Sequence, residues 1–238
     1  MADSKILASE SYSEGELKKK TQLVTDIFEV EKGTLVWPGF RDPLAGLVQT
    51  LLTHNTTDAN AFPAYDEMRS KFPNWKDIDE ASGEEIAFTI KRAGLQNQKA
   101  KRIKALLAFV KEEFGKYTAD SLKGMSFDEA LKSFGHLPGV KHKTLAVVLC
   151  FDLGVDVFPV DTHVHRVCKR LGLVSEKGDA VKTFNAMRAL VPAGKSYQLH
   201  IHMIRHGREL CFARKPNCES CFLAKECLFF QQMKKKNI

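Results

Sequence analysis

Apolar residues recur at spacings of three and four in segment after segment of this chain. In residues 43–52 the pattern follows Asp42 and Pro43, which suit the N-cap and the first position of a helix. The same periodicity returns in residues 101–114, 162–171 and 180–191, and residues 145–153 are apolar nearly all round, which predicts a buried helix. No segment shows sustained alternation with period two, and no Asn-Gly or Asp-Gly hairpin signal occurs. The sequence therefore predicts an all-α fold.

The composition suits one large domain or two small ones with a real core. Of the 238 residues 44% are hydrophobic, and 36 Lys and Arg against 29 Asp and Glu give a formal net charge of +7. Basic residues recur in short groups, at positions 18–20, 99–104, 141–143, 205–208, 214–215 and 234–236. A solvated face explains any one group equally well, but their repetition favours a nucleic-acid partner.

Neither a membrane span nor a secretion signal is visible in the sequence. No stretch approaches the roughly 20 apolar residues that cross a bilayer, and the N-terminus has no apolar signal core. We therefore expect an intracellular protein without a membrane partner, in the cytoplasm or nucleoid if the cell is prokaryotic. The first twenty or so residues, rich in Ser, Glu and Lys, are expected to be partly disordered.

Four cysteines lie close together near the C-terminus. They form a C-x6-C-x2-C-x5-C array of Cys211, Cys218, Cys221 and Cys227. In an intracellular protein such an array is unlike a disulfide framework, and four neighbouring thiolates need a cation to offset their repulsion. Zinc and a [4Fe–4S] cluster both satisfy this chemistry. The other two cysteines, Cys150 and Cys168, lie on apolar helix faces and are expected in the core.

The segment FGHLPGVKHKTLAVVL joins a Pro-Gly turn to a helix start. A turn at Leu137-Pro138-Gly139-Val140 can present backbone N–H groups to an anion beside a helix N-terminus. Lys143 falls in the first turn of that helix. It is either a phosphate clamp or, if partly buried, a neutral amine that acts as a nucleophile. This segment alone favours the clamp.

Eighteen residues further on, Asp161 occupies a predicted N-cap in the segment FPVDTHVHRV. Its simplest role is that cap, worth about 1 kcal/mol. Its functional role would be a carboxylate that stabilises positive charge at a sugar carbon and moves protons.

Three segments together, LPGVKHKTLAVVL, FPVDTHVHRV and HGRELCFARKPNCESCFLAKEC, resemble the endonuclease III family of the helix-hairpin-helix base-excision DNA glycosylase superfamily. The resemblance runs from about Asp42 to Cys227, with the motifs in the family's order and spacing. It implies two helical domains: a six-helix domain with the hairpin at residues 36–155, and a second in which residues 1–35 join residues 156–238. It also implies that the cysteine array holds [4Fe–4S] rather than zinc.

The resemblance assigns roles to individual residues. Lys143 matches the catalytic lysine and Asp161 the catalytic aspartate. Leu95 matches a leucine that wedges into the duplex, and Asn55 falls where a glutamine fills the gap left by the extruded nucleotide. The remaining expected DNA contacts are Leu137, Pro138, Gly139, Val140, Lys141, Arg214 and Lys215. The expected base pocket consists of Thr53, His54 and Asp58. Asp58 matches an aspartate of the family that lies on the same helix as the residue matched by Asn55. Without the resemblance, Leu95 is an exposed turn leucine and Asn55 a polar residue at a helix end.

The activity that the resemblance implies is removal of a damaged base. The nucleotide is flipped out of a duplex, Lys143 attacks C1′, and the Schiff base allows β-elimination on the 3′ side. The partner is double-stranded DNA with a damaged base or an abasic site, and we expect a monomer.

Three positions depart from the family's pattern. Lys141 replaces the second hairpin glycine, which should strain the turn while adding an ammonium for a phosphate. Thr53-His54-Asn55 replaces a Ser-Ala-Gln type of segment, so base preference is open. Phe222 replaces the proline that often follows the third cysteine, which should alter packing and not ligation.

Three functions are therefore weighed. The leading one is a glycosylase with AP lyase activity on oxidised pyrimidines. The second is a mismatch thymine, uracil or alkylated-base glycosylase on the same fold. The altered His54-Asn55 segment favours this function. The presence of Lys143 argues against it if the enzyme hydrolyses the base–sugar bond without a lyase step. The third is a non-catalytic iron–sulfur DNA-binding protein, which both Lys143 and Asp161 oppose.

Overall fold

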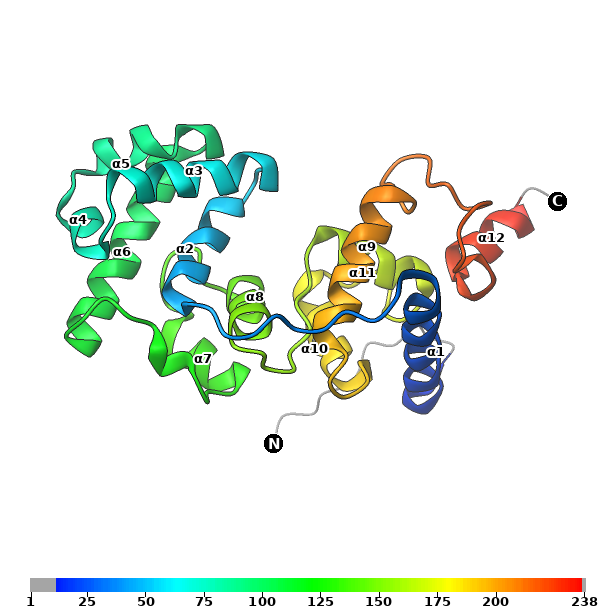
Figure 1. Cartoon of the computed structure of the whole chain (residues 1–238). Helices are drawn as coiled ribbons and strands as arrows, with labels where there is room; N and C mark the ends of the chain where they lie inside the picture. Colours follow the sequence, from blue (N-terminus) through cyan, green and yellow to red (C-terminus); the bar gives the residue numbers. More distant parts are fainter. Residues whose placement is uncertain (1–11, 237–238) are drawn as a thin grey trace. The chain divides into compact units, whose positions relative to one another are not determined.

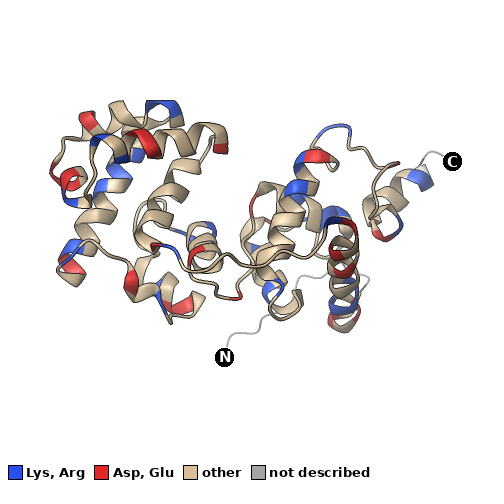
Figure 2. Ribbon diagram, viewed as in Figure 1, with Lys and Arg blue, Asp and Glu red and all other residues tan. Residues whose placement is uncertain are grey.

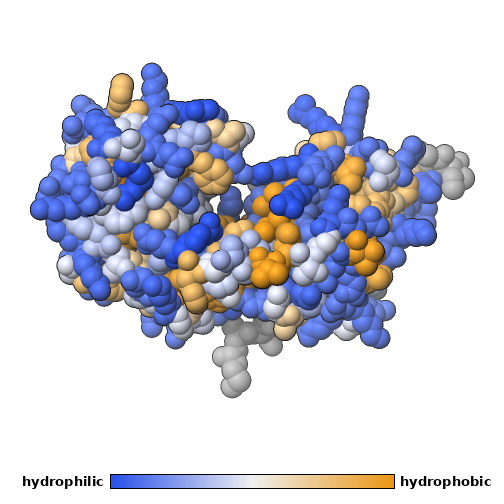
Figure 3. Space-filling model, in the orientation of Figure 1, coloured by the Kyte–Doolittle hydropathy of each residue, from blue (hydrophilic) through white to orange (hydrophobic). Residues whose placement is uncertain are grey.

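The structure, a computed structural model, describes residues 12–236, and over that range the chain is helical with no strand (Figure 1). The prediction of an all-α fold is confirmed. The chain divides into two compact units, one formed by Gly39–Val155 and the other by Met1–Pro38 together with Asp156–Ile238. None of the described helices is both long and apolar enough to cross a membrane. Hydrophilic residues cover most of the surface visible in Figure 3, with scattered apolar patches between them.

The unit Gly39–Val155 contains seven α-helices. They are α2 (Pro43–Thr53), α3 (Asp58–Lys71), α4 (Trp75–Glu80), α5 (Gly83–Thr89), α6 (Gln96–Phe114), α7 (Phe127–Phe134) and α8 (His142–Asp152), with 3₁₀ turns η1 (Lys91–Ala93) and η2 (Asp120–Leu122). The family resemblance implied six helices in this domain, whereas the structure has seven. Two of them, α4 and α5, are short helices that start separately, at the capping boxes of Asn74 and Ser82.

Helix α2 is the core helix of this unit and packs against α3 and α8. Five of its apolar side chains are fully buried: Leu44, Leu47, Val48, Leu51 and Leu52. The helix starts as predicted, because the Asp42 carboxylate accepts a hydrogen bond from the Leu44 N–H at 2.9 Å. Helix α8 is buried on most sides, as its uniformly apolar sequence predicts.

A buried carboxylate at the end of α8 packs directly against α2. Asp152, at the end of α8, is 4% exposed and pairs with the Arg41 guanidinium at 2.7 Å. A Cβ added to Gly46 of α2 would lie 1.8 Å from Asp152 Oδ2, so only glycine fits there. Burial raises the pKa of Asp152 to about 6, although Arg41 opposes the shift.

The second unit consists of helices from both ends of the chain. They are α1 (Glu14–Lys32), α9 (Thr162–Leu171), α10 (Ala180–Leu190), α11 (Ser196–Glu209) and α12 (Leu228–Lys236), with the 3₁₀ turn η3 (Ala224–Glu226). Of the first twenty residues, which were expected to be partly disordered, those from Glu14 onward belong to α1, because Ser13 and Glu16 form a capping box that starts the helix. Residues 1–11 lie outside the described range. Cys150 of the first unit and Cys168 of the second are buried, as predicted.

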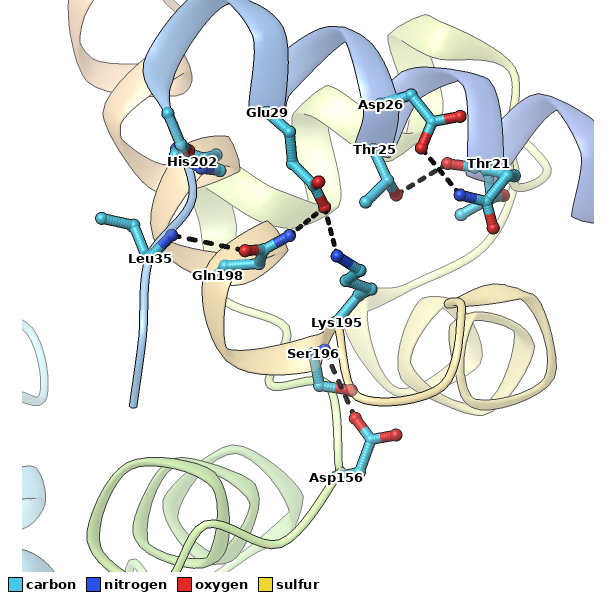
Figure 4. A network of polar contacts seen from close by, with 12 residues as sticks. Thr21, Thr25, Asp26, Glu29, Leu35, Asp156, Lys195, Ser196, Gln198 and His202 are labelled. Carbon is cyan, nitrogen blue, oxygen red and sulfur yellow. Dashed lines mark hydrogen bonds and ion pairs between the residues drawn. The ribbon is translucent and has the colours of Figure 1, made fainter. Parts of the chain in front are cut away.

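A polar network joins the N-terminal helix to α11 (Figure 4). The Glu29 carboxylate of α1 accepts hydrogen bonds from Lys195 Nζ at 2.7 Å and from Gln198 Nε2. Gln198 Oε1 in turn accepts from the Leu35 N–H, and Asp156 accepts from the Ser196 N–H. Residues more than 160 positions apart are thereby held in one unit.

Candidate functional site

The Pro-Gly turn forms a helical hairpin between α7 and α8. The Val140 N–H donates to the Leu137 carbonyl at 3.1 Å, which closes the turn. Gly139 has a φ of 85°, and a Cβ there would lie 2.8 Å from Leu51 Cδ2 and 3.0 Å from Arg102 Cδ. Only glycine satisfies both the backbone conformation and the close packing on α2 and α6.

Lys141 occupies the hairpin position where the family has a second glycine. Its φ of −127° and ψ of −168° are extended backbone that any residue adopts, so the expected strain is wrong. Its ammonium donates to the Gly135 carbonyl at the end of α7. The lysine therefore closes the hairpin through its side chain.

Lys143 is the second residue of α8, as predicted, but it is exposed. The partial burial expected for it is wrong. Helix α8 starts at His142, and its N-cap residue Lys141 makes no side-chain hydrogen bond to the first turn. The exposed side chain of Lys143 thus stands at a helix start, where an anion is favoured.

The segment after α2 contacts this hairpin through His54. His54 Nε2 lies 3.2 Å from Thr144 Oγ1, and the Thr144 hydroxyl donates to the Gly139 carbonyl at 2.8 Å. Because the hydroxyl has only one proton, the imidazole must be the donor, which assigns the Nε2–H tautomer. Burial, with positive charge from Lys143, Arg102 and Lys99, lowers the pKa of His54 to about 4, so the ring is neutral.

Two residues expected to enter the duplex have left-handed backbone conformations. Asn55 has a φ of 53° and Leu95 a φ of 48°, and both are exposed, Leu95 by 51%. Asparagine tolerates this region, whereas leucine rarely adopts it. Leu95 takes the N-cap position of α6, which begins five residues earlier than its apolar pattern indicates. Asp58 starts α3, so its expected place on the same helix as Asn55 is wrong.

A buried lysine links the segments that carry these two residues. Lys99, counted in the sequence as part of a basic surface group, has no exposed area. Its ammonium donates to the Leu52 carbonyl at 2.7 Å and to the Ala93 carbonyl at 2.8 Å. No sequence signal marks this role, because the first contact spans 47 positions.

Asp161 belongs to the other unit, where it starts α9. Its Oδ1 accepts from the Val164 N–H at 2.8 Å, so the predicted cap is confirmed. Lys143 lies in the unit Gly39–Val155, so the two expected catalytic residues come from different units.

We call residues 211–227, which carry the four cysteines, the cysteine loop. Two arginines of α9 hold the first part of this loop. Arg170 donates to the Phe212 carbonyl at 2.7 Å, to the Ala213 carbonyl at 3.0 Å and to Cys211 Sγ at 3.2 Å. Arg166 donates to the Cys211 carbonyl at 3.0 Å. Between the cysteines, Arg214 and Lys215 are exposed, and Figure 2 shows the positive charge of the loop between α11 and α12.

The four cysteines of this loop line one pocket. They are unbridged and partly buried, and the rest of the lining is mostly apolar, with Arg170, Asn217 and His206 as its other polar residues and His206 beside Cys221. Burial raises the pKa of the Cys218 and Cys227 thiols, and that of Cys221 to about 11. Thiolates there therefore need a bound cation, which fits a thiolate-ligated group. Among residues 12–236 no three His, Cys, Asp or Glu side chains converge on a point that would hold a single metal ion.

The family is decided by a match along the chain. The description "HhH-GPD superfamily base excision DNA repair protein" matches residues 48–193, more than half of the 238 residues. The chain belongs to the HhH-GPD superfamily. The matched range includes the hairpin, Lys143 and Asp161, and stops before the cysteine loop.

Several superfamily members resemble this chain over most of its length. A DNA glycosylase of Arabidopsis thaliana is 35% identical over 73% of this chain, a match that spans 59% of the plant protein. Endonuclease III of Thermotoga maritima is 32% identical over 83% of this chain and 88% of its own length. A thymine/uracil-DNA glycosylase of Methanothermobacter thermautotrophicus is 28% identical over 90% and 96% of the two chains.

Solved structures of superfamily members show the same fold. A non-covalent endonuclease III–DNA complex has a TM-score of 0.78 at 27% identity, covering 92% of this chain and 98% of that one. A trapped endonuclease III–DNA covalent intermediate gives 0.77 at 26%, covering 94% and 99%. A thermostable thymine-DNA glycosylase gives 0.74 at 27%, covering 90% and 98%. This HhH-GPD protein is thus an endonuclease III-like DNA glycosylase that acts on DNA.

Proposed function

We propose that this glycosylase removes oxidised pyrimidines and cleaves the abasic strand as an AP lyase. The observation that carries the proposal is the accessible side chain of Lys143 in the first turn of α8, directly after the hairpin. An exposed amine is accessible to a flipped-out nucleotide, while the hairpin N–H groups and helix start favour its flanking phosphate. The family resemblance assigns the carboxylate of the proposed mechanism to Asp161, the N-cap residue of α9.

In the proposed reaction the Lys143 amine forms a bond to C1′ as the C1′–N bond to the base breaks and the base leaves with that electron pair. Asp161 stabilises the positive charge that develops on the sugar and accepts a proton. Opening of the sugar ring gives a protonated Schiff base between Lys143 and C1′. Loss of a proton from C2′ then expels the 3′ phosphate by β-elimination, and water releases the lysine.

Helix starts support a DNA-binding face on the unit Gly39–Val155. Helices α2, α5 and α7 begin with Asp42, Ser82 and Ser126, each of which accepts a hydrogen bond from a first-turn N–H. The N-cap residues of α3, α6 and α8 make no such hydrogen bond, and neither does that of α4, which carries no proposed DNA contact. The starts of α3, α6 and α8 follow Asn55, Leu95 and the hairpin, the segments proposed to contact DNA. Uncapped first-turn N–H groups favour phosphate oxygens.

Backbone strain supports insertion by Asn55 and Leu95. Among residues 12–236 the non-glycine residues with positive φ are Asn55, Leu95 and Lys215. All three belong to the proposed DNA contacts, and strain of this kind persists where the surrounding structure holds a residue for its function. We propose that Leu95 wedges into the duplex and that Asn55 fills the space of the extruded nucleotide.

We propose that Cys211, Cys218, Cys221 and Cys227 hold a [4Fe–4S] cluster. Each thiolate of such a cluster binds a different iron, so the four sulfurs need not converge on one point as zinc ligands do. Its role when bound is structural: it would fix the loop that presents Arg214 and Lys215 to the DNA backbone.

The pocket segment favours a second candidate function. The neutral His54 bonded to Thr144 stands where the family has a smaller residue, and one relative at 28% identity is a thymine/uracil-DNA glycosylase. A larger side chain held in one orientation in the proposed base pocket would select among bases by shape and hydrogen bonding. Mismatched thymine and uracil are therefore the alternative substrates.

The test uses duplexes with an abasic site, thymine glycol, uracil, a G·T mismatch or an alkylated purine, incubated with the protein and borohydride. Lys143→Gln is the matched control, since it keeps a polar side chain without the amine. Lysine-dependent covalent trapping on the abasic and thymine-glycol duplexes is the expected result. Base release from the uracil or G·T duplex without trapping would establish the second function. Binding to every duplex with no base release at all would leave a non-catalytic DNA-binding protein.

A further inference from the structure

Lys99 is a fully buried ammonium whose two hydrogen bonds both go to backbone carbonyls. It lies in the first turn of α6, has no exposed area, and bonds to Leu52 and Ala93 at 2.7 and 2.8 Å. No carboxylate pairs with it among the described residues. Burial, with the nearby Arg102 charge, lowers the pKa of Lys99 to about 8. Burying a cation without an anion is costly, so ordinary core packing does not explain a lysine here.

The two carbonyls that Lys99 contacts end two segments that are distant in sequence. The Leu52 carbonyl belongs to the last turn of α2, where backbone acceptors have no partner within the helix. The Ala93 carbonyl ends the 3₁₀ turn η1. One side chain therefore satisfies both acceptors and fixes the distance between the two segments.

Each of these segments leads directly to a residue with left-handed backbone. Asn55 follows Leu52 by three positions and Leu95 follows Ala93 by two, with φ of 53° and 48°. The Lys99 N–H also donates to the Leu95 carbonyl at 3.0 Å, so the backbone of Lys99 holds Leu95 itself. The same residue thus contacts the supports of both exposed side chains.

We infer that Lys99 is a positioning residue that sets the spacing between Asn55 and Leu95, so that both enter a lesion-containing duplex together. The inference rests on the proposed DNA roles of those two residues. Lys99 itself, being buried, touches no DNA. Its loss therefore weakens binding to a duplex with an extruded nucleotide and leaves binding to undamaged duplex, which depends on phosphate contacts, largely unchanged.

The same helix provides a matched control. Lys104 donates to the Asp79 carbonyl at 2.7 Å and to the Ala81 carbonyl at 2.6 Å. It makes the same kind of double contact from α6, but to the end of α4, which carries no proposed DNA residue. Substituting Lys104 therefore reproduces the structural effect of losing two carbonyl contacts without affecting Asn55 or Leu95.

The experiment compares Lys99→Met and Lys104→Met with the unsubstituted 238-residue chain, each purified with its proposed iron–sulfur cluster. The measured quantity is the ratio of dissociation constants for undamaged duplex and for a duplex with a tetrahydrofuran abasic analogue. We expect Lys99→Met to lower this ratio about tenfold, equivalent to ~1.4 kcal/mol, and Lys104→Met to preserve it. The folded fraction of each variant is checked by thermal unfolding, and if Lys99→Met is unfolded at the assay temperature, Lys99→Gln replaces it.

Two further variants separate failure of the inference from failure of the proposed function. If Leu95→Ala and Asn55→Ala leave the ratio unchanged, the proposed insertion roles are wrong. If they lower it while a folded Lys99 variant does not, the positioning role of Lys99 is wrong. If Lys99→Met acts through these two residues, its effect in the Leu95→Ala background will be smaller than in the wild type. An additive effect would overturn the inference.

Discussion

The imidazole of His54 donates to the Thr144 hydroxyl across 3.2 Å, and Thr144 is the residue directly after Lys143. The segment expected to form the base pocket is thereby bonded to the helix that carries the proposed nucleophile. Because the Thr144 hydroxyl donates onward to the Gly139 carbonyl at 2.8 Å, the pocket segment and the hairpin turn form one hydrogen-bonded chain. A change at His54 therefore affects both the pocket and the hairpin.

The first prediction concerns acid stability. The pKa of His54 falls from 6.5 to about 4 on folding, so its contribution to stability is full above pH 6.5 and is lost as the pH falls towards 4. For His54→Asn the free energy of unfolding should be about 1 kcal/mol lower than wild type at pH 7. The gap should narrow or reverse by pH 4.5, as measured by urea unfolding.

Thr144→Val is the control for this prediction, since it removes the hydrogen-bond partner but keeps the imidazole. Its unfolding free energy should run parallel to that of wild type between pH 7 and 4.5. If the free energy of unfolding of His54→Asn also runs parallel to that of wild type over this pH range, folding does not lower the pKa of His54.

A second prediction concerns the hairpin glycine. Gly139→Ala combines a φ of 85° with a Cβ 2.8 Å from Leu51 Cδ2, so the turn must shift. We expect about 2 kcal/mol lower stability and a weaker affinity for abasic duplex. Gly124 has a φ of 84° and open space around its Cα, so Gly124→Ala incurs the backbone cost alone. Fluorescence anisotropy should show that only Gly139→Ala weakens DNA binding, and equal effects of the two variants would contradict the packing explanation.

The contact between α2 and α8 gives a third prediction. In Gly46→Ala the new methyl group would overlap the buried Asp152 carboxylate, and we expect a loss of roughly 2–3 kcal/mol in the free energy of unfolding. Gly83→Ala, in α5, meets nothing within 4 Å and should be neutral or stabilising by up to ~1 kcal/mol. Thermal unfolding measures both variants. An equally stable Gly46→Ala would show that α2 and α8 can separate without cost.

The last prediction concerns the cysteine loop. Arg170→Gln removes the donors to the Phe212 and Ala213 carbonyls and to Cys211 Sγ. Trypsin should then cleave after Arg214 several-fold faster, because the loop loses its attachment to α9. Lys169→Gln on the same helix is the control. Removing the proposed cluster by chelation should accelerate the same cleavage in wild type, and an unchanged rate would mean that the thiolate-bound group does not hold the loop.

Local patterns in the sequence determined the helices and their starts. Asp42 before Pro43 predicts the start of α2, and Asp161 predicts the start of α9, because a cap needs only a side chain and an N–H two or three residues away. The cysteine array and the hairpin are likewise readable, since their chemistry depends on spacing within a short segment. The apolar faces of α2 and α8 follow from periodicity.

Periodicity failed where neighbours in space decide. Val181 fits the apolar pattern of α10 but is 42% exposed, because periodicity along a helix does not show which part of its apolar side the fold covers. The start of α6 was missed by five residues, since Leu95 begins it in a left-handed conformation that no propensity predicts.

Only the tertiary structure decided how the site is held together. Lys99 reads as one more surface cation until folding buries it against the carbonyls of Leu52 and Ala93. Lys141 suggests backbone strain until its extended conformation is seen, and no sequence pattern places its ammonium on the Gly135 carbonyl. The bond between His54 and Thr144 joins residues 90 positions apart. The lysine contacts depend on which backbone carbonyls the fold leaves without partners, and the His54–Thr144 bond depends on which helices lie side by side. Both follow from the packing of whole helices and not from any short stretch of sequence.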